Sequence, residues 1–407
     1  MAKCIACSGK LSMVLNLGTM PSANNLTKKE DLNRVKSYPL RYYSCEKCGL
    51  LQLTKFASGS VLFDEYLYLT GASPSLVEHF REMSEYLGGE VNGRGMAYAI
   101  ASNDGTEIKL LKDVGFKRVV GIDPSSAADI ANKNDLFTVR AFFTPDLARK
   151  LAADTGKADL IVANNVFAHI PDPKGMLEGM AILVKPDGLI SIEVHWMKSI
   201  VDKLEFETLY AEHYFVWSIK AMQTVAAQAG LNIKDIVYMP NQHGGSLRFL
   251  LQKERAETKK GLAKHPYAKL ERMETESRIY DVRYLKANLQ KRVDKRRYKL
   301  VKLIRNIKDN GKTISIWSVP AKVPTLLNFC GITNKEITCA YEVAPTKIGK
   351  WIPKSRIEIK DQDRIMHDMP DYLIVGAWNY WDFANKKFAP YMKNGGKLIN
   401  PLTLEIK

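Results

Sequence analysis

Ala97-Tyr-Ala-Ile-Ala-Ser-Asn-Asp-Gly105 is the stretch of this 407-residue chain that decides the fold. Its apolar half predicts a buried strand, and the polar turn with a glycine leads into a helical pattern. Gly121-Ile-Asp-Pro124 ends the next predicted strand and brings Asp123 about 20 residues after that turn. In an open α/β sheet, the carboxyl ends of neighbouring strands lie together and bind ligands. We therefore expect a ligand site at these two turns.

Both turns suit S-adenosylmethionine. In a class I methyltransferase the first turn lets the backbone approach the methionine part, and a carboxylate at the second accepts the ribose hydroxyls. Asp123 can instead cap the following helix. A third buried strand, 159–163, ends in the polar stretch Asn164-Asn-Val-Phe-Ala-His169. It lacks the Asn-Pro-Pro-aromatic segment that grips a flipped base, which counts against base methylation. The cofactor-binding candidates are Ala101, Ser102, Asn103, Asp104, Gly105, Asp123, Pro124, Asn164 and Asn165.

Strands and helices alternate from residue 96 onward, which predicts a parallel sheet covered on both faces. A long helical pattern separates this region from a second α/β rhythm, which begins after Gly311. The fold class is therefore α/β, with a class I methyltransferase core of Rossmann-like type, a small module before it and a third, smaller α/β domain after the helical stretch. The expected domains are a zinc module at 1–60, a methyltransferase domain at 61–252, a helical connector at 253–310 and a substrate domain at 311–407.

Four of the six cysteines form two C-x-x-C pairs, Cys4 with Cys7 and Cys45 with Cys48. Four thiolates can surround one tetrahedral zinc ion and leave no open position for a substrate, so we expect a structural zinc. Chance pairs of buried thiols are the alternative. Cysteine usage of this kind fits a reducing compartment, and the cytoplasm is the expected location.

The net charge of +16 raises the question of nucleic acid. Residues 253–312 hold 20 Lys or Arg and 8 Asp or Glu, so most of the excess lies in the helical connector. Acidic residues are interleaved and no aromatic stacking platform is evident, which favours a solvated helix face over a nucleic-acid partner. No apolar run reaches about 18 residues, so we expect no membrane span. A monomer is the expected state.

The stretch Glu207-Thr-Leu-Tyr-Ala-Glu-His-Tyr214 places a histidine beside a carboxylate and a phenol. These groups can fix the tautomer of His213 and tune its pKa, which makes it a candidate general base. The catalytic candidates are His213, Glu212, Tyr210 and His169. Downstream, Gln242-His-Gly-Gly-Ser-Leu-Arg248 offers close backbone approach and polar side chains, although a strand-entry turn explains the glycines equally well.

The order of these motifs resembles the sugar C-methyltransferases that act on nucleotide-linked 4-keto-6-deoxy sugars. The resemblance spans nearly the whole chain, and it is carried by the cysteine module and by the stretches 65–73, 102–105, 165–169, 210–213, 243–246, 326–331 and 377–379. It implies a zinc-binding N-terminal domain, a central S-adenosylmethionine domain and a C-terminal Rossmann-like domain that helps to hold the sugar nucleotide. It also implies that His213 is the general base.

Three departures from the family pattern affect the expected contacts. Ala99 stands where the family usually has Glu, the Gly-rich turn ending in Lys-Gly is here Ser318-Val-Pro-Ala-Lys-Val323, and a Pro-Gly pair is Pro353-Lys354. The substrate-binding candidates are Tyr66, Tyr68, Thr70, Ser73, His243, Gly244, Gly245, Ser246, Arg248 and Lys322.

A 4-keto group would acidify the C3 proton. We expect His213, oriented by Glu212, to remove that proton while Tyr210 and His169 donate hydrogen bonds to the enolate oxygen. Two alternatives stay open: O-methylation of a similar sugar nucleotide, and a zinc-containing protein or methyltransferase that acts on nucleic acid.

Overall fold

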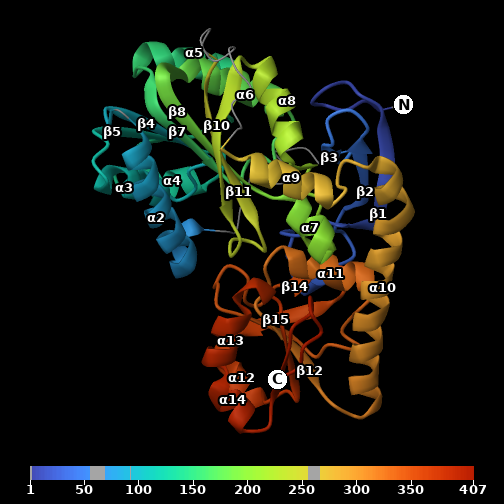
Figure 1. Ribbon diagram of the computed structural model, residues 1–407. Coiled ribbons are helices and arrows are strands. Elements are labelled where there is room, and N and C mark those ends of the chain that lie inside the picture. Colours follow the sequence, from blue (N-terminus) through green and yellow to red (C-terminus); the bar gives the residue numbers. More distant parts are fainter. Residues whose placement is uncertain (1, 56–68, 92, 255–265) are drawn as a thin grey trace.

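The computed structural model describes residues 2–55, 69–91, 93–254 and 266–407. It contains a four-stranded, a seven-stranded and a six-stranded sheet. Figure 1 shows the seven-stranded sheet above the six-stranded one, with the blue N-terminal strands at the side of both. Among the described residues, no helix is both long and apolar enough to span a membrane.

The central sheet has the order β10-β11-β8-β7-β4-β5-β6, in which β11 alone is antiparallel to its neighbours. When the seven strands are numbered in chain order and counted from the β6 edge, their order across the sheet is 3-2-1-4-5-7-6. The strands are β4 (Met96–Ile100), β5 (Arg118–Ile122), β6 (Thr138–Val139), β7 (Ala158–Asn164), β8 (Val184–His195), β10 (Leu231–Met239) and β11 (Ser246–Lys253). The predicted strands at 96–101, 118–122, 159–163 and 189–194 are confirmed.

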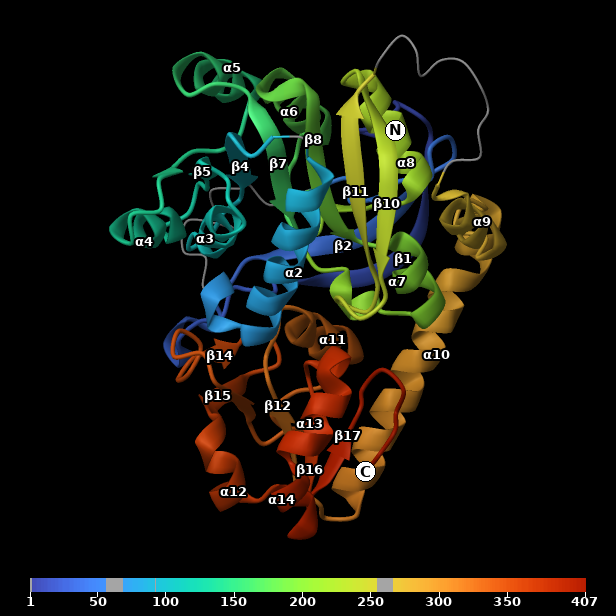
Figure 2. The same cartoon turned by 60° about the vertical axis from the view of Figure 1, so that its left-hand side comes forward.

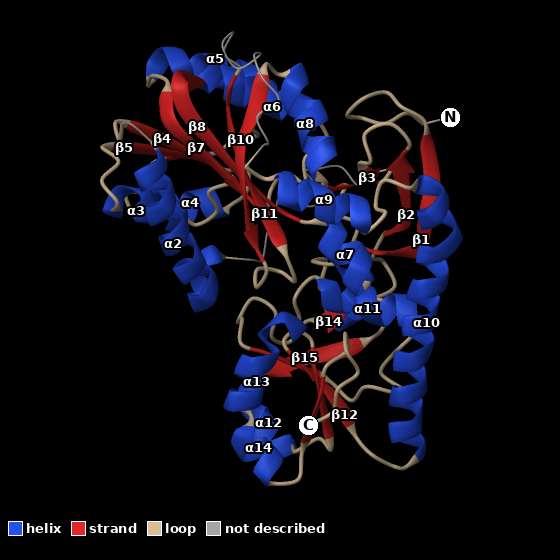
Figure 3. Ribbon diagram, viewed as in Figure 1, coloured by secondary structure: helices blue, strands red, loops and turns tan. Residues whose placement is uncertain are grey.

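Helices cover both faces of this sheet, as Figures 2 and 3 show. Because side chains alternate along a strand, Ala97 and Ala99 face one apolar core while Tyr98 faces the other. Burial on both sides explains why these strands are almost continuously apolar. The covering helices are α2 (Pro74–Glu90), α3 (Thr106–Asp113), α4 (Ala127–Lys133), α5 (Pro145–Asp154), α6 (Pro173–Leu183) and α8 (Ile219–Gln228).

The N-terminal sheet has the order β1-β2-β3-β9. Three strands come from the predicted zinc module: β1 (Leu11–Pro21), β2 (Ser37–Cys45) and β3 (Leu51–Gln52). The fourth, β9 (Phe215–Val216), comes from much later in the chain and pairs antiparallel with β3. The N-terminal sheet is therefore completed by the residues that directly follow the predicted catalytic stretch.

The C-terminal sheet has the order β14-β15-β13-β12-β16-β17, with β14 antiparallel and the other strands parallel. Its strands are β12 (Ile314–Trp317), β13 (Ala340–Glu342), β14 (Trp351–Ile352), β15 (Ile357–Asp361), β16 (Tyr372–Val375) and β17 (Lys397–Ile399). Its helices are α11 (Lys322–Cys330), α12 (Ile365–Asp368), α13 (Trp381–Lys387) and α14 (Ala389–Lys393). Alternating strands and helices with a parallel core confirm the Rossmann-like prediction for this region.

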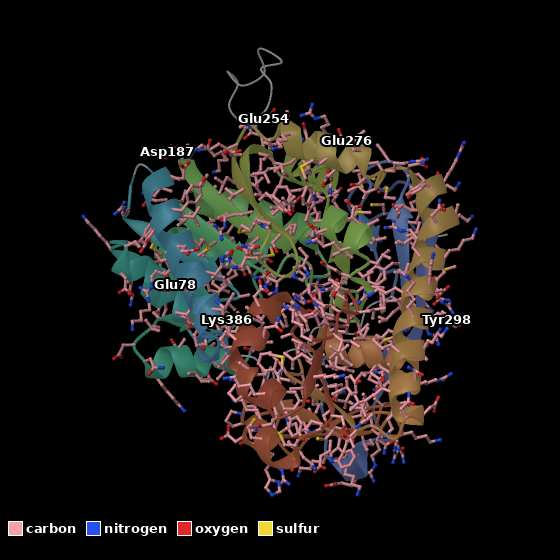
Figure 4. All side chains as sticks on the ribbon, turned by 60° about the horizontal axis from the view of Figure 1, so that its bottom comes forward. Glu78, Asp187, Glu254, Glu276, Tyr298 and Lys386 are labelled. Carbon is pink, nitrogen blue, oxygen red and sulfur yellow. The ribbon has the colours of Figure 1, made fainter. Side chains whose placement is uncertain are left out.

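Helix α9 (Ala268–Glu276) and the 28-residue helix α10 (Val282–Asp309) form the connector. At about 1.5 Å per residue, α10 is long enough to pack against β1 at one end and the C-terminal sheet at the other. One apolar stripe is buried, and the basic residues lie mainly on the other face. Tyr298, labelled in Figure 4, lies on that outer face and is 65% exposed.

A buried ion pair joins α10 to the catalytic stretch. Arg296 donates to both carboxylate oxygens of Glu207, at 2.6 and 2.9 Å, and also to the carbonyl oxygens of Leu204 and Pro401. Arg296 is 7% exposed and Glu207 is fully buried. A charge left unpaired in such a place is costly, so this contact holds the three parts of the chain together.

We predict that Arg296→Met lowers the free energy of unfolding by about 3–5 kcal/mol, because it leaves the buried Glu207 carboxylate without its ion-pair partner. Lys295→Met is the matched control: it changes an exposed neighbour on the same helix and should alter stability by about 0.5 kcal/mol or less. Urea unfolding measures both. Equal, small losses in the two variants would contradict this account of the ion pair.

Candidate active site

The four cysteines of the N-terminal module converge as predicted. Cys4 Sγ lies 3.6 Å from Cys48 Sγ, Cys7 Sγ lies 3.4 Å from Cys45 Sγ, and all four sulfur atoms lie within 4.8 Å of one another. A tetrahedral zinc with Zn–S bonds of about 2.3 Å would separate its sulfurs by roughly 3.8 Å, so the cluster has the right size. The cysteines lie on the loops that flank β1 and β2, where a metal would fasten the two ends of this hairpin together.

The predicted cofactor residues lie together at the carboxyl ends of adjacent parallel strands of the central sheet. The loop Ala101–Gly105 follows β4, Asp123 and Pro124 follow β5, and Asn164 and Asn165 end β7. Ala101 and Asn103 have left-handed φ values of +58° and +51°, a strain that proteins tolerate mainly at functional sites. Gly105 has φ +84°, and a Cβ there would lie 2.7 Å from a methyl carbon of Leu136, so this turn requires glycine.

Two orphaned polar atoms at this edge fit a bound cofactor. Ser102 Oγ and Asn164 Oδ1 are buried without a hydrogen-bond partner in the described part of the chain. Such atoms are costly unless a ligand or water satisfies them. The Asn164 side-chain amide donates to Glu107, a buried carboxyl on α3 whose pKa is raised by burial to about 7. Glu107 was not predicted, because its position in the first turn of a helix was its one signal in the sequence.

Asp123 links the turns that follow β4 and β5, and its role toward a ribose stays a prediction. One carboxylate oxygen accepts from the backbone N–H of Asn103 at 2.9 Å, and the other accepts from the N–H and hydroxyl of Ser125. Asp123 therefore braces the first turn against the second strand and caps the next turn. Its remaining lone pairs are the ones that ribose hydroxyls could use.

Thr70 and Gly71 dock on the cofactor loop. Their backbone N–H groups donate to the side chains of Asn103 and Asp104, at 3.0 and 2.8 Å. The structure thus brings Thr70 beside the predicted cofactor residues, whereas Ser73 is half-buried and its hydroxyl lies 3.4 Å from that of Ser75. Tyr66 and Tyr68 lie outside the described residues.

The carboxylate of Glu212 binds the N-terminal module. It accepts hydrogen bonds from the hydroxyl of Ser22 at 2.5 Å and from the backbone N–H groups of Ala23 and Asn24, at 3.1 and 2.9 Å. The hydroxyl of Tyr42, on β2, donates to the carbonyl of His213 at 2.7 Å. The prediction that Glu212 orients the His213 ring is therefore wrong: Glu212 ties the loop to the N-terminal sheet.

The His213 ring is held from two sides. Its Nδ1 lies 2.6 Å from the carbonyl oxygen of Thr208, and a carbonyl can only accept, so Nδ1 carries the proton. The Tyr210 ring stacks on it, with centroids 3.9 Å apart. Burial, and then the charge of His169, holds the pKa of His213 well below its ordinary value. The imidazole is therefore neutral at pH 7, with a lone pair on Nε2.

Four histidine rings lie in succession at this site. The His213 centroid is 4.7 Å from that of His169 and 5.5 Å from that of His195, and His195 is 4.7 Å from His243. Burial lowers the pKa of His169 and of His243 to about 4. His195 ends β8 at the same edge as the cofactor loops, yet it was not among the predicted residues. Its position at the carboxyl end of a parallel strand was the available signal.

The His243-Gly-Gly-Ser turn leads into β11, as its strand-entry interpretation requires. A Cβ on Gly244 would lie 2.4 Å from a carboxylate oxygen of Glu205, so the backbone here packs directly on that side chain. Gly245 is likewise in contact with Ser199, and the Ser246 hydroxyl donates to the carbonyl of Gln242 at 3.2 Å. These contacts show what the glycines and Ser246 do within the fold.

Arg248 does not point at an open ligand site. It lies 2.8 Å from Glu193, which also binds His79 at 2.8 Å, and all three are buried. Burial alone would raise the pKa of Glu193, but the hydrogen bond from His79 and the charge of Arg248 hold it at about 2. The substrate-binding prediction for Arg248 is therefore corrected to a buried ion pair that joins β8 to β11.

Lys322 of α11 brings the C-terminal sheet to the site. Its ammonium donates to Asn379 at 2.6 Å and lies 3.8 Å from the centroid of the Trp378 ring. Burial lowers its pKa to about 8. Glu205 lies on the same side: it is 1% exposed, neither carboxylate oxygen has a hydrogen-bond partner among the described residues, and burial raises its pKa to about 8. Glu205 was also not among the predicted site residues.

Three family models match successive parts of the chain. Residues 4–63 match "Putative zinc binding domain", residues 100–236 match "Methyltransferase domain", and residues 241–403 match "C-methyltransferase C-terminal domain". The first match contains all four cysteines, and the second contains the cofactor loops. The chain is therefore similar, part by part, to zinc-containing C-methyltransferases. It is thus an enzyme that depends on S-adenosylmethionine, and its cysteine cluster is the metal site of a zinc-binding domain.

The C-methyltransferase NovU of Streptomyces niveus is 29% identical over 393 residues, which are 96% of this chain and 92% of that protein. Among solved structures, an S-adenosylmethionine-dependent methyltransferase of Anabaena variabilis is 17% identical, with a TM-score of 0.36, and the alignment covers 46% of this chain and 86% of that one. Magnesium protoporphyrin IX methyltransferase of Synechocystis is 13% identical, with a TM-score of 0.33, over 44% and 79% of the two chains.

We predict about one zinc per chain and its loss in Cys45→Ser, because a hydroxyl cannot replace a thiolate ligand. Cys339→Ser changes another buried thiol, in the C-terminal sheet, and should keep the metal. Metal analysis of the purified variants measures the outcome. Full zinc content in Cys45→Ser would refute the four-thiolate site.

We also predict that Glu212→Ala lowers kcat on the order of 100-fold, because the loop that carries the predicted base His213 loses the contacts that position it. Since the carboxylate binds residues 22–24, the acid limb of the pH–rate profile should stay where it is. Ser22→Ala, which removes one donor, should have a smaller effect in the same assay. A shifted acid limb in Glu212→Ala would mean that Glu212 acts on the His213 ring after all.

Proposed function

We propose that the enzyme methylates C3 of a nucleotide-linked 4-keto-6-deoxy sugar, with His213 as the general base. The observation that carries this proposal is the state of the His213 ring. It is neutral, its Nδ1–H is committed to the Thr208 carbonyl, and Nε2 is left as the one basic atom. A ring fixed in this way can abstract a proton in one direction only.

Carbon needs an adjacent carbonyl before its proton becomes acidic, and a 4-keto sugar provides one next to C3. His213 Nε2 takes the C3 proton, and the electrons of that bond move toward the ketone oxygen to form an enolate. The hydroxyl of Tyr210, whose ring stacks on His213, would donate a hydrogen bond to this oxygen and stabilise its charge. His169 is neutral and its one N–H is bound to the Glu212 carbonyl, so the prediction that it also donates to the enolate is not carried further.

The residues at the ends of β4, β5 and β7 would hold the cofactor. Ser102 and Asn164 have unsatisfied buried atoms there, and Asp123 has lone pairs directed at the first turn. When bound, S-adenosylmethionine supplies a methyl group on a positively charged sulfur. The residues of this chain contribute by holding the enolate carbon in line with that methyl group and by keeping water out.

The nucleotide would lie between the central and C-terminal sheets. Lys322 lies on α11, and its positive charge is among the causes that lower the pKa of both His195 and His243. A diphosphate is the anionic part of a sugar nucleotide, and an ammonium group is a suitable partner for it. Although the turn Ser318–Val323 departs from the family pattern, it still contains Lys322, which would bind the diphosphate in this proposal.

We predict that His213→Gln lowers kcat on the order of 100-fold or more, because glutamine is not a base. In the wild-type enzyme, the acid limb of kcat/KM should lie below pH 6.5, the ordinary pKa of His, because only the neutral ring accepts a proton. Rates of methyl transfer to a thymidine-diphosphate-linked 4-keto-6-deoxy sugar, measured from pH 4.5 to 9, give both results. Unchanged turnover in His213→Gln would contradict the proposal that His213 is the general base.

A second limb should appear at alkaline pH. Lys322 is positively charged below its pKa of about 8 and neutral above it, so KM for the sugar nucleotide should rise as the pH passes that value. Lys322→Met should have a high KM at pH 7 and should lack this limb. If Lys322→Met keeps the wild-type KM, the diphosphate binds elsewhere.

A further inference from the structure

We propose that His195 is a proton-relay residue, which accepts the proton from His213 and passes it to His243, so that the base is restored for the next turnover. The inference rests on the proposed role of His213. It assigns a task to a histidine that the sequence motifs do not mark, and it concerns a step after methyl transfer rather than the transfer itself.

The proton has to leave because a methyl group takes its place on the carbon. His213 begins neutral and becomes an imidazolium when Nε2 takes the C3 proton. The product has no further use for that proton, and a protonated His213 cannot act again. The ring is only 7% exposed and its Nδ1 is bound to Thr208, so direct loss to bulk water is obstructed.

His169 is the nearer ring, but it is poorly placed to act as the acceptor. Its Nδ1 lies 2.7 Å from the carbonyl oxygen of Glu212, and it makes a second backbone hydrogen bond with Asn165. Those contacts hold the ring as a hydrogen-bond donor to the main chain. His169 is therefore committed to the main chain and is less suited than His195 to accept a proton from His213.

His195 has the features that a relay requires. It meets the His213 ring edge-on, with an interplanar angle of 86°, and its buried Nδ1 has no hydrogen-bond partner among the described residues. On its other side the His243 ring follows at 4.7 Å. His243 lies in the turn before β11, at the boundary with the C-terminal sheet, so the succession of rings leads away from the reacting carbon.

The surrounding charges favour transfer of the proton through His195 and His243 over its retention on either ring. The groups that act on His195 are His243, His213, Lys322 and His169. Burial, followed by these neighbouring charges, keeps His195 and His243 neutral at rest, so each ring has a lone pair to offer. The positive charge of Lys322 disfavours an imidazolium at either ring. A proton that arrives there is transferred onward to water: the carbon loses H⁺, gains CH₃, and one H⁺ is released for each turnover.

The test compares the first turnover with the later ones in His195→Gln, using the thymidine-diphosphate-linked 4-keto-6-deoxy sugar and S-adenosylmethionine. Rapid-quench measurement should show a first turnover at the wild-type rate, followed by a steady-state rate that is at least about ten-fold lower. Added imidazole should restore part of the steady-state rate. His367→Gln changes an 85% exposed histidine side chain and should match the wild type in both phases.

A second readout follows the proton itself. In deuterium oxide without the methyl donor, the wild-type enzyme should exchange the C3 hydrogen of the sugar for deuterium. In His195→Gln the abstracted proton stays on His213 and returns to carbon, so the exchange should slow while the first turnover of methyl transfer does not. If His195→Gln does not fold, His243→Gln interrupts the same path and should give the same pattern.

Two results would overturn the relay. One is a wild-type steady state in His195→Gln; the other is an equal loss of first-turnover and steady-state rates without rescue by imidazole, which would make His195 a binding or structural residue. Neither result would contradict the proposed role of His213 as the base, because His213→Gln should abolish the first turnover in any case. A normal first turnover in His213→Gln would instead overturn the proposed function together with the relay.

Discussion

The site depends on the attachment of the loop 204–214 to the N-terminal sheet. The Glu212 carboxylate accepts hydrogen bonds from residues 22–24, the Tyr42 hydroxyl binds the His213 carbonyl, and β9 continues the sheet directly after the loop. Hydrogen bonds to a charged group are each worth about 1.5–3 kcal/mol. Together they fix His213, the proposed base, which the central sheet alone does not hold.

In the proposed mechanism, this constraint makes the zinc module a support for His213 that takes no part in the reaction itself. Four thiolates fill a tetrahedral metal, so the ion binds no substrate. It fastens the ends of β1 and β2, and those strands carry the groups that hold His213. From the other side, Arg296 of α10 holds Glu207 in the same loop. The loop is thus supported by the N-terminal sheet and by the connector, while Lys322 approaches from the C-terminal sheet.

Much of the fold could be predicted because it follows from local pattern. Apolar strands such as β4 and β7, ending in polar turns, predict a doubly covered parallel sheet, and the spacing of the cysteines predicts one metal site. The long helix α10 was evident from the regular recurrence of its apolar residues. These features depend on residues that are close together in the sequence.

The site was less predictable because its contacts are distant in the sequence. Glu212 stands next to His213 but binds residues about 190 positions earlier, so adjacency suggested the wrong partner. The two-residue strand β9 carries no pattern of its own. His195 and Glu205 belong to no motif in the sequence. Only the folded chain shows that His195 joins a succession of rings and that the buried Glu205 carboxylate has no hydrogen bond among the described residues, with the Lys203 ammonium 4.0 Å away.

The position of the new methyl group tests the central claim most directly. The enzyme would receive S-adenosylmethionine with a ¹³C-labelled methyl group and a sugar nucleotide labelled with ¹³C at C3, and the product would be examined by carbon NMR. Direct bonding of the two labelled atoms, seen as a one-bond ¹³C–¹³C coupling, is the predicted result. A labelled methyl group attached to oxygen, without that coupling, would contradict proton abstraction from carbon by His213.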